Sequence, residues 1–576
     1  MKKLFLFALL LVTTGLLADG VQPDGSGTEA DPYQVETLDN LLWVSTTDSS
    51  WASHFIQTAD IDATDTQNWN GGEGFSPIGF NDIRFTGAYN GQEHTIDGLY
   101  MNRPTLDYMG LFGKTNGATI ENLGVINVNV IGQGKVGGLV GENHDDSFIS
   151  ACYSTGSVSG NEEVGGLVGK SRGNSTVTDC HSTVGVSGEG DVGGLVGNSF
   201  HSTINGCHST GNVSGDYPAG GLVGRNEQST VSDSYSTGNV SGGSHTGGLA
   251  GCNSWDSSIS NCYSTGNVSG GSSVGGLVGH NYESTNIDCY ATGNVSGGSK
   301  VGGLAGGHVI ASIISNCYCT GNVEGDVFVG GLVGLNTNVA IINNSYCTGN
   351  VSGDDDVGGL LGFHGCSTIS QCYSIGNVSG NTDVGGLVGM NEDSTVSSSF
   401  WNIETSGQAT SAGGTGKTTA EMQDVATYTS LATPGLDAPW DFAGNPFDDI
   451  GNEDYWDIDG TTNSGYPFLS DAGVGIGDEE AVPAPTSAIT LHPAFPNPFN
   501  PTTTIRFSVA KRQSATLQIF NLRGQLVKSY AVFAAGEHEV VWDGADNSGR
   551  GVGSGVYLYR LQSAGTQQVR KMVLLK

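Results

Sequence analysis

Charged residues are scarce in this chain, and those present are mostly of one sign. Only 14% of the 576 residues are charged, and 57 Asp and Glu outnumber 21 Lys and Arg, which gives a formal net charge of −36. This acidic excess disfavours nucleic acid or an anionic lipid surface as a partner. Proline is rare as well, with 15 residues against 93 glycines. The absence of a Gly-X-Y period argues against collagen, and the low proline content argues against a proline-rich disordered chain.

Long apolar runs are missing beyond the start of the chain. No later segment holds the roughly 18 uninterrupted apolar residues that a spanning helix needs, so no transmembrane segment is expected. Residues 1–18 combine a basic start at Lys2 and Lys3, an apolar stretch from Leu4 to Val12 and a small-residue cleavage site at Leu17-Ala18. This is the pattern of a secretory signal peptide. We therefore expect export and a secreted or cell-surface location.

A Gly-Gly-Leu-Val-Gly-like block recurs every 27 or 28 residues. A degenerate copy at Met109–Gly113 comes first, so that about eleven units span residues 109–400. Short β-branched segments between glycine turns are strands, and units this small bury their apolar faces only by stacking, so the period predicts a parallel β-solenoid in an all-β chain. The block glycines are expected to supply positive φ and close backbone approach at corners. They are Gly137, Gly165, Gly193, Gly220, Gly247, Gly275, Gly302, Gly330, Gly358 and Gly385.

Stacked coils place equivalent residues in columns, and cysteine fills one of them. In-register strands hold side chains parallel, whereas a disulfide needs Cβ atoms turned toward each other, so buried free thiols are favoured. Cys319 and Cys347, which are equivalent to each other, are the pair best placed to be an exception. A second column of asparagines is expected to form an amide ladder. The cysteine column holds Cys152, Cys180, Cys207, Cys262, Cys289, Cys317 and Cys372, and the asparagine column holds Asn212, Asn239, Asn267, Asn294, Asn322, Asn350 and Asn377.

An aromatic column follows directly after the cysteine column. Alternation along a strand puts one column in the core and the other outside, so buried thiols imply an exposed strip of rings that stacks on a glycan or a partner surface. A packing stack partly covered by neighbouring loops is the preferred alternative. The candidate contact residues are Tyr153, Tyr235, Tyr263, Tyr290, Tyr318, Tyr346 and Tyr373, with His181, His208 and Phe400 as ring substitutes.

The regions that flank the repeats are predicted to be caps and a separate domain. An open solenoid exposes strand edges, so residues 19–108 are expected to form a β-rich N-terminal cap and residues 401–472 a C-terminal cap. Residues 473–490 shift to glycine, acidic residues, proline and alanine, which is typical of a linker. Alternating strands in residues 491–576 predict a small Ig-like β-sandwich.

Both regions resemble known families. The Gly-Gly-Leu-Val-Gly blocks, together with Cys-Tyr-Ser-Thr-Gly-Asn-Val-Ser-Gly, resemble the GLUG repeat of bacterial surface proteins. The last 86 residues, with Phe495–Pro501, Asn521–Gly524, Trp542–Gly544 and Ser554–Tyr557, resemble the type A sorting domain of type IX secretion substrates and are also similar to the Ig-like domain of flagellar hook-capping proteins. The sorting resemblance implies passage across an outer membrane through the secretion machinery, with residues 491–576 as the recognised part.

Motifs that carry chemistry are incomplete. His538–Trp542 has Trp where a zinc protease needs its second histidine, and Ser411–Thr418 lacks the opening glycine of a phosphate loop. Asp457–Gly460 and Asp60–Asp62 lack the spacing of a calcium loop, so structural turns are predicted for both. Asp354–Asp356 lies in a variable tip and is interpreted as solvated turn acids. No catalytic residue, metal site or cofactor is predicted.

These observations favour an adhesion or interaction protein that uses the solenoid as a rigid scaffold for a glycan or protein ligand. The alternative is a polysaccharide-active β-helix enzyme, a lyase or a hydrolase. A catalyst usually shows one coil broken by an insertion, and the regular 27-or-28-residue spacing leaves little room for one. We therefore expect a protein that is not an enzyme.

Overall fold

The computed structural model describes residues 20–80, 83–443 and 455–470. Toward the C-terminus it describes residues 489–491, 499, 502–509, 515–521, 526–530, 533, 536–547, 550–563 and 566–574. The predicted signal peptide, most of the predicted linker and most of the motifs at 495–501 and 521–524 lie outside these residues. The chain divides into two compact units, residues 1–476 and 477–576.

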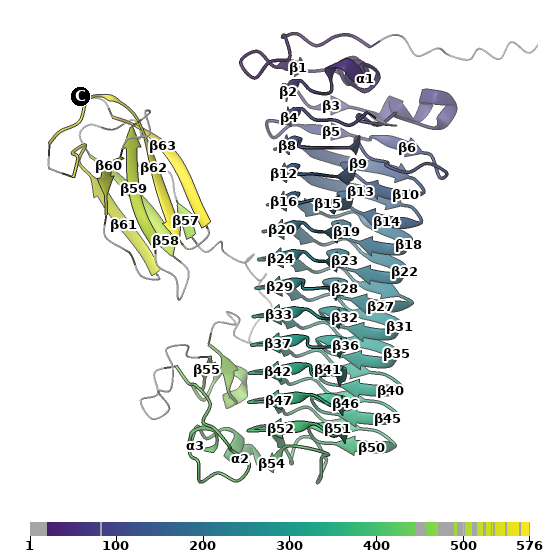
Figure 1. Cartoon of the computed structure of the whole chain (residues 1–576), viewed down its shortest axis with the longest axis vertical. Coiled ribbons are helices and arrows are strands. Elements are labelled where there is room, and N and C mark those ends of the chain that lie inside the picture. Colours follow the sequence, from purple (N-terminus) through teal and green to yellow (C-terminus); the bar gives the residue numbers. More distant parts are fainter. Residues whose placement is uncertain are drawn as a thin grey trace, which may run out of the picture. The chain divides into compact units, whose positions relative to one another are not determined.

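The first unit is a parallel β-solenoid, as predicted (Figure 1). One coil contributes β29 (Ser258–Ser260) to a first sheet, β30 (Tyr263–Ser264) and β31 (Val268–Gly275) to a second, and β32 (Val278–Tyr282) to a third. The next coil repeats the pattern with β33 (Thr285–Ile287), β34 (Tyr290–Ala291), β35 (Val295–Gly302) and β36 (Ala305–Val309). The three sheets contain 14, 29 and 11 strands.

The register between coils is one repeat, so equivalent residues pair. Tyr263 pairs with Tyr290, and Val268 pairs with Val295. Strands of a single coil have no partner within that coil, because every ladder in these sheets joins one coil to the next. A coil is therefore stable only inside the stack.

The cysteine column lies in the core and its thiols are free, as predicted. The Cys262 side chain is 1% exposed, and its Sγ lies 3.1 Å from the carbonyl oxygen of Ser260. Burial raises the pKa of the Cys262 thiol to about 12. Cys319 and Cys347 pair in register yet are free thiols, so the expected exception was wrong.

The block glycines are required by close approach rather than by positive φ. A Cβ on Gly275 would lie 2.0 Å from the carbonyl oxygen of Val278, and the other nine block glycines give 1.9–2.3 Å to the equivalent oxygen. Positive φ occurs instead two residues earlier, for example 48° at Asp191 and 52° at Asp356. The prediction was thus right about space and wrong about φ, because the left-handed turn precedes the block.

The N-terminal region is itself largely stacked coil. Its strands extend the first two sheets, so the parallel stack begins at β1 and the boundary predicted at residue 109 marks only the start of the repeat motif. The helix α1 (Leu38–Thr46) begins at a capping box on Thr37 and buries Leu41 and Val44. The other elements are β1 (Tyr33–Val35), β2 (His54–Gln57), β3 (Ile61–Asp62), β4 (Ala88–Asn90), β5 (Thr95–Asp97), β6 (Tyr100–Asn102) and the 3-10 segments Asp48–Ser50 and Thr64–Gly72.

The C-terminal cap closes the last coil at its edge and along one side. The Ser411 hydroxyl oxygen accepts hydrogen bonds from the backbone N–H groups of Leu387 and Val388, at 3.2 and 2.8 Å. The glycine-rich segment that resembles a phosphate loop thus covers a strand edge. The cap comprises β53 (Phe400–Asn402), β54 (Thr415–Lys417), α2 (Thr419–Met422), α3 (Ala426–Thr429), β55 (Trp456–Asp457), the 3-10 segment Thr462–Gly465 and β56 (Phe468–Leu469).

The second unit is a small antiparallel β-sandwich, as predicted. One sheet contains β57 (Ile489–Leu491), β58 (Thr503–Val509) and β61 (Gly536–Trp542), and the other contains β60 (Leu526–Ser529), β59 (Ala515–Asn521), β62 (Gly555–Ser563) and β63 (Thr566–Leu574). Their inward residues form one hydrophobic cluster. His538 and Trp542 lie on strand β61 rather than on a helix, and Trp542 is fully buried.

Candidate binding surface

The aromatic column forms a continuous stack of rings outside the core. Consecutive rings from Tyr153 to Tyr373 have centroids 4.8–5.1 Å apart and planes within 12° of parallel. The coil spacing sets this distance, since each ring stands on the strand that pairs with the next. Cysteines therefore point inward and rings outward, as strand alternation predicts.

The cap covers the C-terminal half of this stack, which corrects the predicted contact strip. Tyr318, Tyr346 and Tyr373 are at most 3% exposed and belong to a hydrophobic cluster with Trp440 and Trp456. The Tyr373 hydroxyl donates a hydrogen bond to the carbonyl oxygen of Pro467. These three tyrosines are packing residues and cannot meet a ligand.

The N-terminal half of the stack remains partly accessible. Tyr153, Tyr235 and Tyr290 are partly exposed, whereas Tyr263 is only 5% exposed. His181 and His208 continue the same stack and are also partly exposed. Burial lowers the pKa of both histidines, which favours neutral rings in the stack. The accessible strip is therefore shorter than the sequence suggested.

A long groove runs along the solenoid beside the asparagine column. It has a volume of about 960 Å³ and crosses the coils from Gly185 to Ser379. Each coil supplies a similar set of side chains to its wall. The lining is Gly185, Val186, Ser187, Asn212, Val213, Ser214, Asn239, Val240, Ser241, Asn267, Val268, Ser269, Asn294, Val295, Ser296, Asn322, Val323, Glu324, Asn350, Val351, Ser352, Asn377 and Ser379.

The asparagines of the groove are held by backbone hydrogen bonds rather than by an amide ladder. The Asn267 side-chain oxygen accepts from the backbone N–H of Asn294 at 3.0 Å, and the Asn294 oxygen accepts from Asn322 at 2.9 Å. The same bond recurs from Asn212 to Asn377. Each amide oxygen is thereby engaged by the following coil. These asparagines are otherwise exposed, and this bonding pattern does not use their amino groups.

Close backbone packing forces this geometry. A Cβ on Gly266, the residue before Asn267, would lie 2.0 Å from the carbonyl oxygen of Gly238. Only glycine fits there, so the chain turns tightly and the following asparagine emerges at the wall of the groove. The wall carries one carboxylate, Glu324, among its lining residues. It is otherwise built from neutral hydrogen-bonding groups and valines.

An amide ladder that the sequence analysis did not predict lies in the core. Asn226 donates from its side-chain nitrogen to the side-chain oxygen of Asn253, and Asn253 donates to that of Asn281, both at 2.9 Å. These three side chains are fully buried. The signal that would have indicated this column is asparagine two residues after the third glycine of the block, which occurs in six of the ten blocks.

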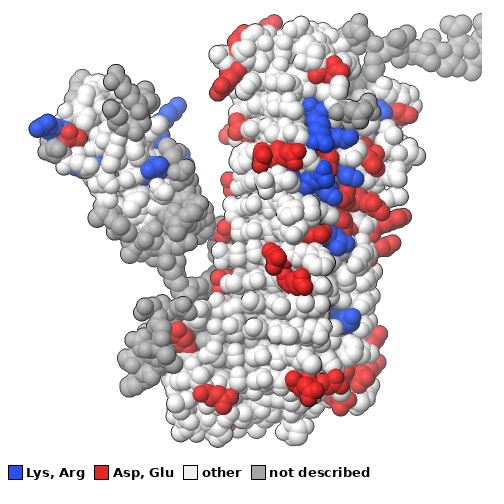
Figure 2. Space-filling view, viewed as in Figure 1, with Lys and Arg blue, Asp and Glu red and all other residues white. Residues whose placement is uncertain are grey.

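Charged side chains follow a different line on the solenoid. The outer ridge consists of the residues two before and five after each first block glycine, and many of its members are paired. Lys135 lies 3.0 Å from Glu163, which also contacts Lys170, and Arg225 lies 2.9 Å from Asp191. In the view of Figure 2, Lys and Arg of the solenoid gather toward its N-terminal half, and only acids are seen near its C-terminal end.

The other motifs with predicted turns have structural partners. The Asp459 carboxylate accepts from the backbone N–H groups of Thr461 and Thr462, and Asp62 accepts from that of Thr64. Of the Asp354–Asp356 run, Asp354 accepts from the Asn381 side chain at 2.9 Å. The remaining two aspartates approach Asp383 of the next coil, a convergence that the sequence interpretation did not anticipate.

Comparisons with known proteins match both regions. The GLUG motif matches residues 217–241, 242–269 and 270–296, and the FlgD Ig-like domain matches residues 499–567. These findings confirm the GLUG and Ig-like resemblances, whereas the sorting assignment stays a prediction. No helix within the described residues is long and apolar enough to cross a membrane.

The curated relatives are much longer than the aligned segments. Halomucin of Haloquadratum walsbyi is 39% identical over 122 residues, which is 20% of this chain and 1% of halomucin. A Gly-rich membrane protein of Evansella cellulosilytica is 32% identical over 145 residues, which is 24% of this chain and 17% of that protein.

Two solved structures show weaker similarity. Dimeric latent PorU from Porphyromonas gingivalis matches at 24% identity with a TM-score of 0.14, over 19% of this chain and 10% of that one. An IgA1 protease matches at 19% identity with a TM-score of 0.32, over 44% and 21%. At these scores neither carries an argument about function. The chain therefore contains GLUG motifs in its solenoid and a match to the FlgD Ig-like domain near its C-terminus.

Proposed function

We propose that this protein is an adhesion or interaction protein whose solenoid groove binds an extended, polar ligand, with a glycan chain as the best match. The observation that carries the proposal is the groove itself, which presents the same asparagine and, in most coils, the same serine. A periodic wall of this kind suits a polymer with a repeating unit better than a compact small molecule.

The chemistry of the wall supports a neutral ligand. Asparagine amino groups donate, and serine hydroxyls both donate and accept, which matches the hydroxyl groups of a sugar chain. Since the asparagine oxygens are already bonded to the next coil, the wall is preorganised and its side chains lose little freedom on binding.

The test removes side-chain amino donors from the groove wall. Asn267→Asp, Asn294→Asp and Asn322→Asp together keep the oxygen that holds the neighbouring coil and remove the amino donors. We expect binding on a glycan array to weaken by at least about tenfold, since each lost hydrogen bond to a neutral group is worth about 1 kcal/mol. The matched control changes three exposed asparagines away from the groove, Asn161, Asn174 and Asn338, to Asp, so that it adds the same number of negative charges. Equal binding by the groove variant and the control would refute the groove as the site.

The polysaccharide-active enzyme remains the alternative function. Glycoside hydrolysis generally uses two carboxyl groups that flank the bond, and the described lining supplies only Glu324, which favours binding. Release of reducing or unsaturated sugar that disappears in Glu324→Gln would instead support catalysis.

We further propose that residues 491–576 deliver the protein across an outer membrane by engaging the secretion machinery. The match of residues 499–567 to a FlgD Ig-like domain supports a folded recognition module. The sorting function itself rests on the sequence resemblance. A module with its own hydrophobic cluster is able to act as a signal independently of the solenoid.

A further inference from the structure

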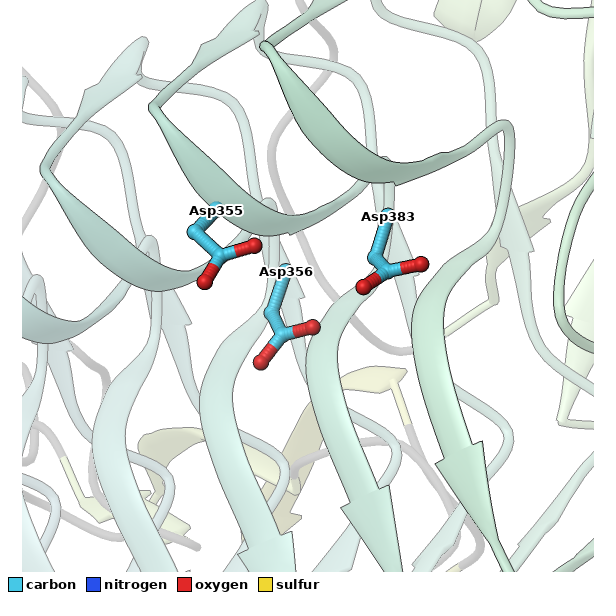
Figure 3. Close-up of side chains that lie close together, drawn as sticks. All are labelled: Asp355, Asp356 and Asp383. Carbon is cyan, nitrogen blue, oxygen red and sulfur yellow. The ribbon is translucent and has the colours of Figure 1, made fainter.

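Three aspartates from two adjacent coils converge near the C-terminal end of the outer ridge. Asp355 and Asp356 lie on β45 (Asp355–Gly358), and Asp383 lies on β50 (Thr382–Gly385), the strand that pairs with it. One carboxylate oxygen of each lies within 4.8 Å of the others. Figure 3 shows Asp356 between the other two side chains.

Asp356 is a buried carboxylate without a hydrogen-bond donor among the described residues. Its exposure is 6%, so more than nine-tenths of the residue is shielded from water. A carboxylate in such a place normally accepts hydrogen bonds or faces a cation, because burial of an unpaired charge is costly. The arrangement leaves a set of lone pairs directed into the cluster.

Other acids at the same ridge position have cationic partners. Glu163 lies between Lys135 and Lys170, and Asp191 binds Arg225. Near Asp356 the positions equivalent to Lys170 and Arg225 are Phe363 and Met390. The cations that neutralise Glu163 and Asp191 therefore have apolar side chains as their equivalents near Asp356.

The charges that act on Asp356 are all negative. The neighbouring charged groups are the carboxylates of Asp355, Asp383 and Glu392. The cluster therefore brings like charges close together, with three carboxylate oxygens within 4.8 Å of one another. A bound cation would relieve both the repulsion and the missing contacts.

We propose that Asp355, Asp356 and Asp383 bind a divalent cation of the calcium type. All three donors are carboxylate oxygens, which hard cations prefer, whereas zinc and copper favour nitrogen and sulfur. Partial exposure of Asp355 and Asp383 leaves room for water to complete the coordination. The ion would bridge two coils and tie the last repeats of the solenoid together.

The experiment is a calcium titration of the full-length chain, stripped with chelator, by isothermal calorimetry. We expect saturable binding with a Kd on the order of 10⁻⁴–10⁻³ M, the range of open extracellular sites. Asp356→Asn should weaken binding at least about tenfold, and asparagine tolerates the positive φ of that residue. Asp383→Asn, at an exposed position, should act similarly without risk to the fold.

The matched control is Asp326→Asn. Asp326 is exposed in the tip of the preceding coil and lies outside the cluster, so this variant removes one charge without removing a ligand. Its calcium affinity should stay within about twofold of the parent, because exposed charges interact weakly across water. Absence of saturable binding up to about 10 mM, well above the expected range, or equal weakening by Asp326→Asn and Asp356→Asn, would overturn the proposal.

Discussion

At the scale of single residues, two histidines take places in the buried amide ladder. Asn281 donates from its side-chain nitrogen to Nδ1 of His308 at 3.1 Å, and His308 Nε2 donates to the carbonyl oxygen of Ile341 at 3.2 Å. His364 makes the equivalent bonds with Asn336 and Thr395. Both rings are therefore held neutral by one accepted and one donated bond.

This arrangement predicts sensitivity to acid. Burial lowers the pKa of His308 to about 4 and also lowers the pKa of His364. The unfolded chain takes up these protons near pH 6.5, so the stability is full above that pH and falls as pH drops from 6.5 toward 4. At pH 5 His308 should weaken the fold by about 2 kcal/mol.

His308→Asn with His364→Asn, which restores the residue used by neighbouring coils, should flatten this loss. Urea unfolding at pH 7.5 and pH 5.0 measures it, with the exposed His201→Asn as control. If the double variant loses as much stability on acidification as the parent, the buried histidines are not the cause.

The sequence predicts the direction in which a side chain points, but not which residues cover it. Strand alternation places Cys262 inside and Tyr263 outside, since it depends on neighbouring residues only. Burial of Tyr346 and Tyr373 depends on Trp440 and Trp456, which fold back from far along the chain. Likewise, Asp356 and Asp383 sit in different repeats, and only the register of the coils brings them together.

At the scale of elements, the unit of stability is one complete coil. A deletion of Gly275–Val301 removes 27 residues and joins Val274 to Gly302, the equivalent of Gly275 one coil later. All columns stay aligned, so we expect a soluble β-rich protein whose melting temperature changes by no more than about 5 °C.

Deletion of Gly275–Ile287 alone is the contrasting variant, because it removes about half a coil and shifts every column. Circular dichroism and size-exclusion chromatography should show a misfolded or aggregated product. Similar folding of both deletions would contradict stacking in register as the source of stability.

At the scale of the whole molecule, the two units have separate cores. A chain that ends at Ile476 should therefore fold its solenoid with an unchanged melting temperature. If residues 491–576 are the export signal, the truncated chain should stay within the cell envelope, as measured by surface proteolysis and fractionation. The one-coil deletion, which retains the second unit, serves as control and should reach the surface. Unchanged delivery of the truncated chain would remove the sorting assignment.

The contact between Ser411 and the final block also bears on self-association of the solenoid. In-register parallel strands are the same surfaces on which amyloid grows, and an uncovered terminal coil would template the addition of another molecule. With Leu387 and Val388 already bonded to Ser411, this part of the terminal edge is closed to another molecule. The cap segment thereby disfavours end-to-end growth of the scaffold at this edge.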